Sequence, residues 1–266
     1  MQSKLYNTTM LLNVYKPKGL TPLQVIEQIR KKFLEYKDEK IGYAGRLDPL
    51  AHGVLLLMMG EETTRQKDKY LNLPKEYEFE AVFGVSTDTF DALGILNNLT
   101  TRVLDNNKLK DAISNFVKKK LGKHEQPYPS YSSKTVNGKP LFQWARENKL
   151  MEIKIPKREI EIYDFKLIEL KEISAKKFEE EIFQQINSVT GDFRQKEIKQ
   201  KWSEFFKENK TTVFRTASFK ISCSSGTYVR SIVNELGKYL GCNAITLEIS
   251  RTKVGNYKLD SSIKLF

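Results

Sequence analysis

The chain has 266 residues, of which 39% are hydrophobic and 29% are charged, and its formal net charge is +12 at pH 7. This length allows one large domain or two small ones around a substantial core, and the composition excludes a disordered chain or a membrane-embedded one. The longest apolar run, Val54–Met59, is too short to span a bilayer. The positive charge favours a polyanionic partner such as nucleic acid, with a generally lysine-rich composition as the alternative explanation.

Cysteine and histidine are too scarce for several kinds of chemistry. Cys223 and Cys242 cannot build a disulfide framework, which fits a reducing compartment and predicts a cytoplasmic protein. The two histidines, His52 and His124, have no metal-ligand spacing, which disfavours a zinc site and a histidine-based triad. The N-terminus has no apolar stretch before a small-residue cleavage site, so no signal peptide is predicted. Any chemistry must therefore use carboxylates, tyrosines, lysines and arginines.

The first half of the chain predicts strands and one well-marked helix. Residues 11–20 predict a strand that enters a Pro/Gly loop, and residues 21–24 form a capping box that opens a helix to about Leu34. Residues 53–59 predict a buried strand. Residues 75–85 alternate as a half-buried strand does, with glutamates on one face. The apolar face of that strand carries Tyr77, Phe79, Ala81, Phe83 and Val85.

The second half of the chain mixes helices with strands. Helices are predicted at residues 106–120, 141–148 and 227–240, and one or two surface helices at 174–209. Strands are predicted at residues 158–170, 212–223 and 245–250, and an Asn-Gly turn precedes the helix that begins at Leu141. Because the helices and strands do not strictly alternate, we expect an α+β fold with a mostly antiparallel sheet.

Asp48 is the first candidate for chemistry. In GRLDPLAHGVLLL, residues 45–57, it stands directly before Pro49 and a strongly apolar run. The proline forces an extended backbone at Asp48, so the carboxylate is predicted on a loop at the mouth of the following strand. A buried carboxylate is costly unless it is paired or used. Considered alone, an Asx-type turn is the commoner explanation, with Arg46 as a local ion partner.

The segment CSSGTYVRS, residues 223–231, is the second candidate. Its backbone N–H groups at a helix start could bind an anion, although an ordinary N-cap by Ser225 or Thr227 is the simpler local explanation. Tyr228 and Arg230 follow in the first helical turn, off the apolar stripe. An arginine there opposes the helix dipole, which indicates an anionic partner, and a buried Asp48 would suit it.

Residues 128–146 interleave aromatic and basic side chains, a pattern that can stack bases and contact phosphates. The aromatic members are Tyr128, Tyr131, Phe142 and Trp144, and the basic ones are Lys134, Lys139 and Arg146. Phe142 and Trp144 lie on a predicted short helix, where core packing is the favoured explanation for both. Tyr77 could equally be one more core aromatic on its strand.

Read in order, KPKGLT, GRLDPLAHG, KEYEFE, STDTFDALG, PSYSSKTVNGKPLFQWAR and SCSSGTYVRSIVNELG resemble the TruB family of tRNA pseudouridine-55 synthases, from about Leu11 to Tyr257. The resemblance implies the pseudouridine synthase fold, a mixed and largely antiparallel sheet flanked by helices. It also implies no cofactor and no metal. It predicts a single catalytic domain over residues 1–266, with a helical insertion at about 174–209 and without the C-terminal PUA domain that most bacterial members add. The basic helices of that insertion could make RNA contacts or be plain surface decoration.

By this resemblance, three residues match the family's catalytic positions. Asp48 matches the catalytic aspartate, Tyr77 the tyrosine stacked against the target uracil, and Arg230 the arginine paired with the aspartate. The substrate-binding positions are matched by Tyr43, Tyr228, Ile249, Lys16 and Lys134. Tyr43 stands where bacterial members usually carry a histidine associated with base flipping.

The function predicted is isomerisation of the uridine at tRNA position 55 to pseudouridine, by base flipping and an aspartate-dependent exchange of the glycosidic bond. The expected partner is the tRNA T-arm, bound by a monomer with no membrane involved. Arg46 replaces a small residue and makes GRLDP similar to synthases that modify ribosomal RNA, so another RNA target is one alternative. A catalytically silent RNA-binding or tRNA-folding protein is the other, and the joint presence of Asp48, Tyr77 and Arg230 weighs against it.

Overall fold

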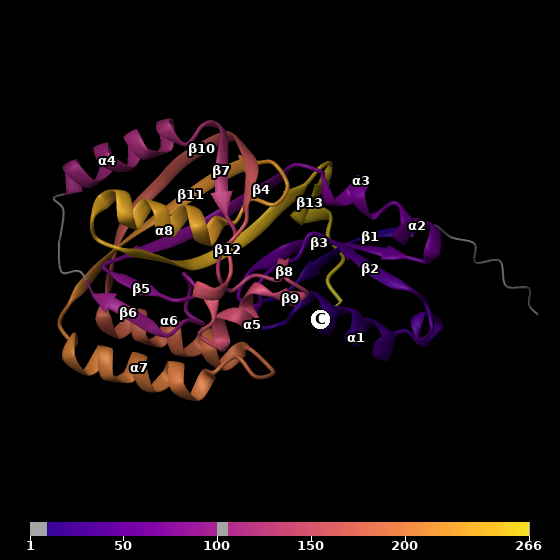
Figure 1. Ribbon diagram of the computed structural model, residues 1–266, viewed down its shortest axis with the longest axis horizontal. Coiled ribbons are helices and arrows are strands. Elements are labelled where there is room, and N and C mark those ends of the chain that lie inside the picture. Colours follow the sequence, from indigo (N-terminus) through magenta and orange to yellow (C-terminus); the bar gives the residue numbers. More distant parts are fainter. Residues whose placement is uncertain (1–9, 100–105, 266) are drawn as a thin grey trace, which may run out of the picture.

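The computed structural model describes residues 10–99 and 106–265. The prediction about a signal peptide falls largely on residues 1–9, outside the described part. Within it, nine strands form one sheet, whose main path runs β1-β3-β12-β4-β11-β10-β7 (Figure 1). These strands are β1 (Met10–Lys16), β2 (Ile41–Ala44), β3 (His52–Met59), β4 (Lys75–Phe83), β7 (Gly122–Pro127), β10 (Lys157–Ser174), β11 (Val213–Cys223), β12 (Ala244–Val254) and β13 (Tyr257–Lys258).

The structure describes eight α-helices. They are α1 (Pro22–Lys32), α2 (Glu61–Arg65), α3 (Lys67–Leu71), α4 (Asn106–Lys119), α5 (Leu141–Arg146), α6 (Ala175–Ser188), α7 (Gln195–Glu208) and α8 (Val229–Leu240). Short 3-10 helices occur at Leu34–Tyr36, Leu150–Glu152 and Leu259–Ser261. Two small hairpins pair β5 (Val85–Thr87) with β6 (Leu96–Leu99), and β8 (Thr135–Val136) with β9 (Lys139–Pro140). No helix in the described ranges is long and apolar enough to cross a membrane.

The sheet is antiparallel except where β12 meets β3. This confirms the predicted α+β class with a mixed, largely antiparallel sheet. At the parallel contact, Gly53 has φ +112°, and a Cβ added there would lie 2.3 Å from the carbonyl oxygen of Arg251. Only glycine allows the two backbones this close. The glycine at position 53, near the start of β3, is therefore required by the close approach of β12.

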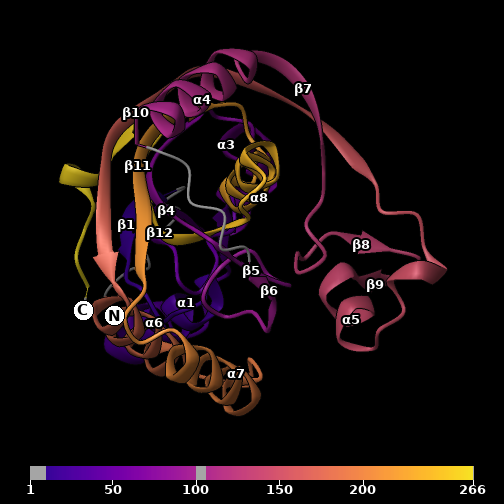
Figure 2. The ribbon, with the colours of Figure 1, turned by 90° about the vertical axis from the view of Figure 1, so that its left-hand side faces the viewer.

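One face of the sheet packs against α4 and α8. The alternation predicted for residues 75–85 places Tyr77, Phe79 and Ala81 of β4 in this core, beside apolar residues of β10 and β11. Figure 2 shows α8 in the hollow of the curved sheet, with α4 beside it. β3 is buried along nearly its whole length, because α1 covers one of its faces and the residues around Val254 cover the other.

Helices α6 and α7 form an antiparallel pair, which we call the helical hairpin, and it packs on the other side of the sheet from α8 (Figure 2). The helices expected at residues 174–209 are therefore present. Each buries one full side: Phe178 and Ile182 of α6 and Trp202 and Phe206 of α7 are almost fully excluded from solvent. The hairpin is thus part of the second hydrophobic core of the protein.

Some local predictions are confirmed and others are wrong. Thr21 and Gln24 form the predicted capping box of α1. The N-cap of α8 is Tyr228, which caps without a side-chain hydrogen bond, so the expected cap by Ser225 or Thr227 is absent. The Thr227 hydroxyl donates instead to the carbonyl of Ser224. Strand β7 was not predicted, because GKHEQP has no apolar alternation and pairs only at the sheet edge.

Candidate active site

A cavity of about 570 Å³ opens where several distant segments meet. Its walls come from the loop between β2 and β3, the start of β4, the loop that leads into α8, β12, the segment between β7 and β10, and the loop between α6 and α7. In Figure 2 the β7–β10 segment, which carries α5, extends away from the sheet. The cavity therefore lies between the sheet, the β7–β10 segment and the loop between α6 and α7.

Asp48 lies on the loop between β2 and β3, at the mouth of the buried strand, as the sequence predicts. Its side chain is 30% exposed. The loop is fixed from below by Lys16, whose Nζ donates to the carbonyls of Ala51 at 2.6 Å and Pro49 at 3.3 Å. The Pro49 carbonyl also accepts from the backbone N–H of Gly19 at 2.9 Å. These contacts fix the backbone of the loop, while the carboxylate of Asp48 stays partly open to the cavity.

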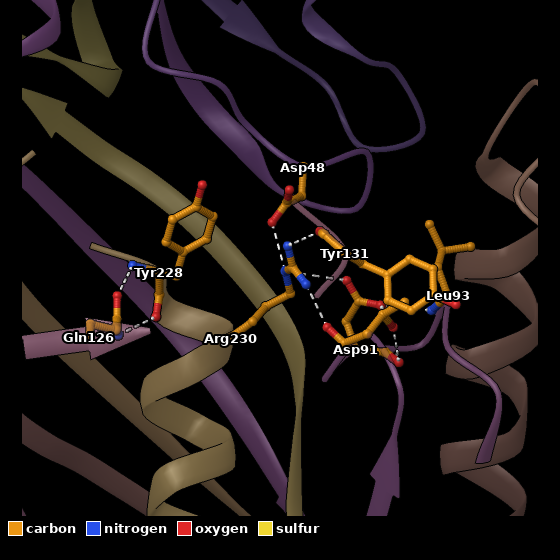
Figure 3. A network of polar contacts seen from close by, with 8 residues as sticks. Asp48, Asp91, Leu93, Gln126, Tyr131, Tyr228 and Arg230 are labelled. Carbon is orange, nitrogen blue, oxygen red and sulfur yellow. Dashed lines mark hydrogen bonds and ion pairs between the residues drawn. The ribbon is translucent and has the colours of Figure 1, made fainter. Parts of the chain in front are cut away.

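Arg230 is the centre of a polar network (Figure 3). Its side chain is 3% exposed, and its Nε lies 2.7 Å from Oδ2 of Asp48. The two terminal nitrogens donate to the carbonyls of Thr89 at 2.5 Å and Tyr131 at 3.2 Å. The expected pairing of Arg230 with a carboxylate at position 48 is present in the structure. An arginine so fully engaged is a fixed positive charge facing Asp48.

Asp91 is a second carboxylate of this network, and sequence reasoning did not single it out. Its Oδ2 lies 3.7 Å from Nε of Arg230, and its Oδ1 accepts from the Thr89 hydroxyl at 2.6 Å and the Leu93 N–H at 3.0 Å. Burial raises the pKa of Asp91, while Arg230 and the hydrogen bond from Thr89 oppose that rise. The motif STDTFDALG contained this residue, but its composition indicated only a turn.

Tyr77 on β4 lines the cavity from the sheet. It is hydrogen-bonded to Arg251 of β12, which is 1% exposed and donates to the carbonyls of Val54 at 2.8 Å and Gly45 at 3.0 Å. Burial raises the pKa of Tyr77, and the charge and hydrogen bond of Arg251 counteract part of that rise. Arg251 was not predicted as a site residue.

The other side of the cavity is aromatic. Tyr228 is held through its backbone, which donates to the side-chain oxygen of Gln126 at 2.8 Å and accepts from its amide at 3.2 Å (Figure 3). The Tyr228 ring meets Tyr128 edge to face at 5.7 Å, and burial raises the pKa of Tyr228 to about 12. Nζ of Lys134 lies 5.4 Å from the centre of the Tyr128 ring. Ile249 of β12 adds an apolar contact surface.

Further basic side chains line the cavity, among them Lys75, Arg158 and Arg46. Lys75 is buried and donates to the carbonyls of Leu71 and Leu73, and burial lowers its pKa to about 7. Arg158 donates to the Ser225 hydroxyl at 3.1 Å. Arg46 contacts the hydroxyl of Ser133. This positive lining suits a polyanion entering the cavity.

Of the eight residues expected at the site, six line the cavity: Asp48, Tyr77, Lys134, Tyr228, Arg230 and Ile249. Lys16 lies beneath the Asp48 loop and does not line the cavity, because its ammonium group is engaged by backbone carbonyls. Tyr43 lies on β2 with its side chain packed toward the α1 core, which also keeps it out of the lining. A substrate-binding role of these two residues stays a prediction.

The expectation that Phe142 and Trp144 are core residues is wrong, since both are only partly buried. Phe142 lines the cavity. Trp144 instead supports the β8–β9 hairpin, because its indole N–H donates to the carbonyl of Val136 at 3.1 Å and Lys139 lies 4.2 Å over its ring. Among residues 10–99 and 106–265, no three His, Cys, Asp or Glu side chains gather as a metal ion would need.

Comparisons with solved structures identify the fold. One chain in the crystal structure of a Cbf5-Nop10-Gar1 complex matches with a TM-score of 0.58 at 21% identity, covering 96% of this chain and 52% of that one. A chain from the structure of an H/ACA RNP bound to a substrate RNA containing 2'-deoxyuridine matches with a TM-score of 0.55 at 19% identity, covering 96% and 50%. The fold is that of the pseudouridine synthases.

The sequence comparisons identify the family. The model for the TruB family pseudouridylate synthase (N terminal domain) matches residues 30–188. The tRNA pseudouridine synthase B of Thermosipho melanesiensis is 31% identical over 256 residues, covering 96% of this chain and 67% of that protein. That of Lactobacillus johnsonii is 33% identical over 254 residues, covering 95% and 70%. The chain belongs to the TruB family, and it spans about two thirds of these curated relatives and about half of the matching Cbf5 chain.

Proposed function

We propose that this protein is a tRNA pseudouridine synthase that converts the uridine at position 55 of the T-loop to pseudouridine. The observation that carries the proposal is the 2.7 Å pair between Asp48 and the buried Arg230, facing a cavity that Tyr77 also lines. A carboxylate held against a fixed cation, beside an aromatic ring, is suited to chemistry on a nucleoside. The matched relatives are named tRNA pseudouridine synthase B.

The target uridine has to leave the T-loop stack before its glycosidic bond can be reached, which costs a few kcal/mol. The cavity offers partial compensation. Tyr77 presents an aromatic surface and Ile249 an apolar one, and stacking on an aromatic side chain contributes roughly 1–3 kcal/mol per base. Lys134 and Arg46 lie among the lining residues, where they can contact phosphates of the flanking nucleotides.

The reaction is an isomerisation, so every atom of the substrate stays in the product. The bond between C1' and N1 breaks, a bond between C1' and C5 forms, and the proton lost from C5 is balanced by one gained at N1. In this proposal Asp48 acts on the sugar, because it is the partly exposed carboxylate of the network. In the same proposal Tyr77 takes the proton from C5 in its phenolate form, which the charge and hydrogen bond of Arg251 favour against the effect of burial.

We further propose that one chain works alone as a single catalytic domain, on the T-arm and in the cytoplasm. The hydrophobic clusters on both faces share one sheet, which supports a single domain. Both cysteines are buried and neither forms a disulfide, which is compatible with a reducing compartment. That residues 174–209 are an insertion into this domain stays a prediction.

The test is to incubate the protein with unmodified tRNA and map pseudouridine by base-specific chemistry. We expect product at position 55 with wild-type protein and none with Asp48→Asn, which keeps the shape of the side chain and should still bind RNA. Product elsewhere in tRNA, or in ribosomal RNA only, would replace the substrate assignment. Turnover by Asp48→Asn near the wild-type rate would overturn the role of the carboxylate, and RNA binding without any product would favour the catalytically silent alternative.

A further inference from the structure

The loop between α6 and α7, residues 189–194, reaches the active cavity. Three of its residues, Asp192, Phe193 and Arg194, line the same cavity as Asp48 and Arg230. The surrounding helices belong to the segment predicted as an insertion, for which RNA contacts by the basic helices and plain surface decoration were the two alternatives. The structure directs attention instead to the short loop that joins them.

This loop is held in one conformation by a dense set of hydrogen bonds. Gln195 accepts from the Phe193 N–H at 2.9 Å and donates to the carbonyls of Val189 at 3.2 Å and Gly191 at 2.8 Å. From the other side, the Gln24 amide of α1 donates to the Thr190 hydroxyl at 2.8 Å. A wall fixed in this way loses little conformational entropy when a ligand packs on it.

The loop is also connected to the catalytic pair through a single residue. Arg194 forms a double contact with Asp88, at 2.8 and 3.2 Å, and its guanidinium lies 4.5 Å from the centre of the Tyr131 ring. The carbonyl of Tyr131 in turn accepts from Arg230, which holds Asp48 (Figure 3). Arg194 therefore fixes the side chain of the residue whose backbone contacts the catalytic arginine.

The charged groups of the loop are already engaged, whereas Phe193 lines the cavity with an aromatic side chain. Asp192 accepts from Arg146 through its backbone carbonyl at 2.7 Å and lies 3.5 Å from it through its carboxylate. Arg194 is paired with Asp88. Phe193 is only partly buried, although it also packs against the hairpin core. A partly exposed aromatic side chain in a positively lined cavity is a surface on which a nucleobase can pack.

We propose that residues 189–194 are a substrate-contacting wall of the active site, with Phe193 packing against the base or ribose of a nucleotide beside the flipped uridine. Arg194 is the positioning residue that ties this wall to Tyr131. The inference rests on the proposed function, and it adds a contact made by the helical hairpin to the site built on the sheet. The partner is a single-stranded RNA segment of the T-loop.

The experiment compares Phe193→Ala with Phe183→Ala. Both phenylalanines are partly buried and pack against the same hydrophobic cluster, but only Phe193 lines the cavity. For each variant we would measure the melting temperature, the equilibrium Kd for a synthetic T-arm hairpin, and kcat and KM for pseudouridine formation. We expect Phe193→Ala to raise Kd and KM about tenfold, the effect of losing one stacked base, and to change kcat much less. Phe193→Trp keeps an aromatic ring and should give Kd and KM close to the wild-type values. Phe183→Ala should leave Kd and KM at the wild-type values.

The outcomes separate this inference from the proposed function. If the wild type forms pseudouridine but both alanine variants have equal Kd and KM, the substrate-contacting wall is refuted and the proposed function stands. If the wild type forms no pseudouridine in any RNA but Phe193→Ala alone weakens hairpin binding, the wall stands and the proposed reaction fails. If there is no product and no difference in binding, both fail. Stacking would also be refuted if Phe193→Trp raised Kd and KM as much as Phe193→Ala does.

Discussion

Arg230 serves two carboxylates whose surroundings differ. Asp48 is 30% exposed and Asp91 is 10% exposed, while the arginine itself is 3% exposed. Burial opposes the charge of Arg230, but Asp48 and Asp91 outweigh it and raise its pKa. Because Asp91 keeps a counter-charge beside the guanidinium, Arg230 can stay in place when Asp48 turns toward a substrate. Asp48 is therefore the carboxylate suited to react with a substrate, and Asp91 is the one suited to hold Arg230 in place.

At the level of single residues, the catalytic candidates could be predicted and their supports could not. Asp48, Tyr77 and Arg230 stand in short motifs whose order in the chain is informative. Arg251 is a register neighbour of Tyr77 on β4 and of Gly53 on β3, so its role depends on strand pairing that no local pattern reveals. Asp91 was hidden for a similar reason, since it meets Arg230 only in the folded chain.

Two buried lysines predict an unusual dependence of stability on pH. Burial lowers the pKa of Lys16 and of Lys75 to about 7, well below the value of about 10.4 expected in the unfolded chain. Above pH 7 the folded protein has released these protons and the unfolded chain still holds them. The unfolded state then binds more protons, so the free energy of unfolding should rise with pH, by at most about 1.4 kcal/mol per pH unit for each lysine.

Urea unfolding measured at intervals between about pH 6.5 and 8.5 checks this rise. The window stops there because burial raises the pKa of Cys223 to about 11, which has the opposite effect at higher pH. Lys75→Met should remove its share of the slope. Lys171→Met, at an exposed position on β10, should leave the slope unchanged. A flat profile for the wild type would show that neither lysine is deprotonated on folding.

Among the elements, the helical hairpin differs most from its sequence-based interpretation. Its helices were predicted from their periodicity, and their apolar faces were visible, but nothing local indicated what those faces would contact. In the structure they complete a core with Val82 of β4, Phe214 of β11 and Ile245 of β12. The loop at its end reaches the cavity for the same reason, because the packing of α6 and α7 on the sheet fixes where that loop lies.

Trp202 tests whether the hairpin is integral to the fold. Its side chain is fully buried and contacts the rings of Phe178, Phe205 and Phe206. We expect Trp202→Ala to lower the free energy of unfolding by about 3–5 kcal/mol through lost burial and the cavity left behind. The transition should stay single, because this core shares its strands with the rest of the sheet. Calorimetry checks both, and the exposed neighbour Lys201→Ala serves as control. A separate transition at lower temperature would instead show that the hairpin unfolds independently of the rest of the protein.

For the molecule as a whole, the fold accounts for the order of the motifs. The loop with Asp48, the strand with Tyr77 and the helix with Arg230 are far apart in sequence, and the order β3-β12-β4-β11 brings them to one cavity. The α+β class followed from the mixture of elements, but this strand order did not, because long-range pairing leaves no local pattern. The resemblance to the TruB family predicted that these residues share one site, which the periodicity of the sequence could not predict.

The net charge of +12 predicts that RNA binding depends steeply on salt. Each phosphate contact by a cation releases counterions, so the logarithm of the affinity should fall linearly with the logarithm of salt concentration, by roughly 0.9 per contact on a duplex and 0.7 on a single strand. If about six phosphates are contacted, affinity should fall about a thousandfold between 50 and 200 mM salt. Filter binding of a T-arm hairpin over that range measures the slope.

Lys134 is the lysine whose removal should change this slope. It lines the cavity over the neutral ring of Tyr128, so its charge is available to a phosphate. Lys134→Gln should reduce the magnitude of the slope by roughly one, because one contact is lost. Lys171→Gln removes the same charge from an exposed strand position paired with Glu169, and should leave the slope unchanged. Equal slopes for the two variants would mean that the RNA is attracted by overall charge, with Lys134 making no contact of its own.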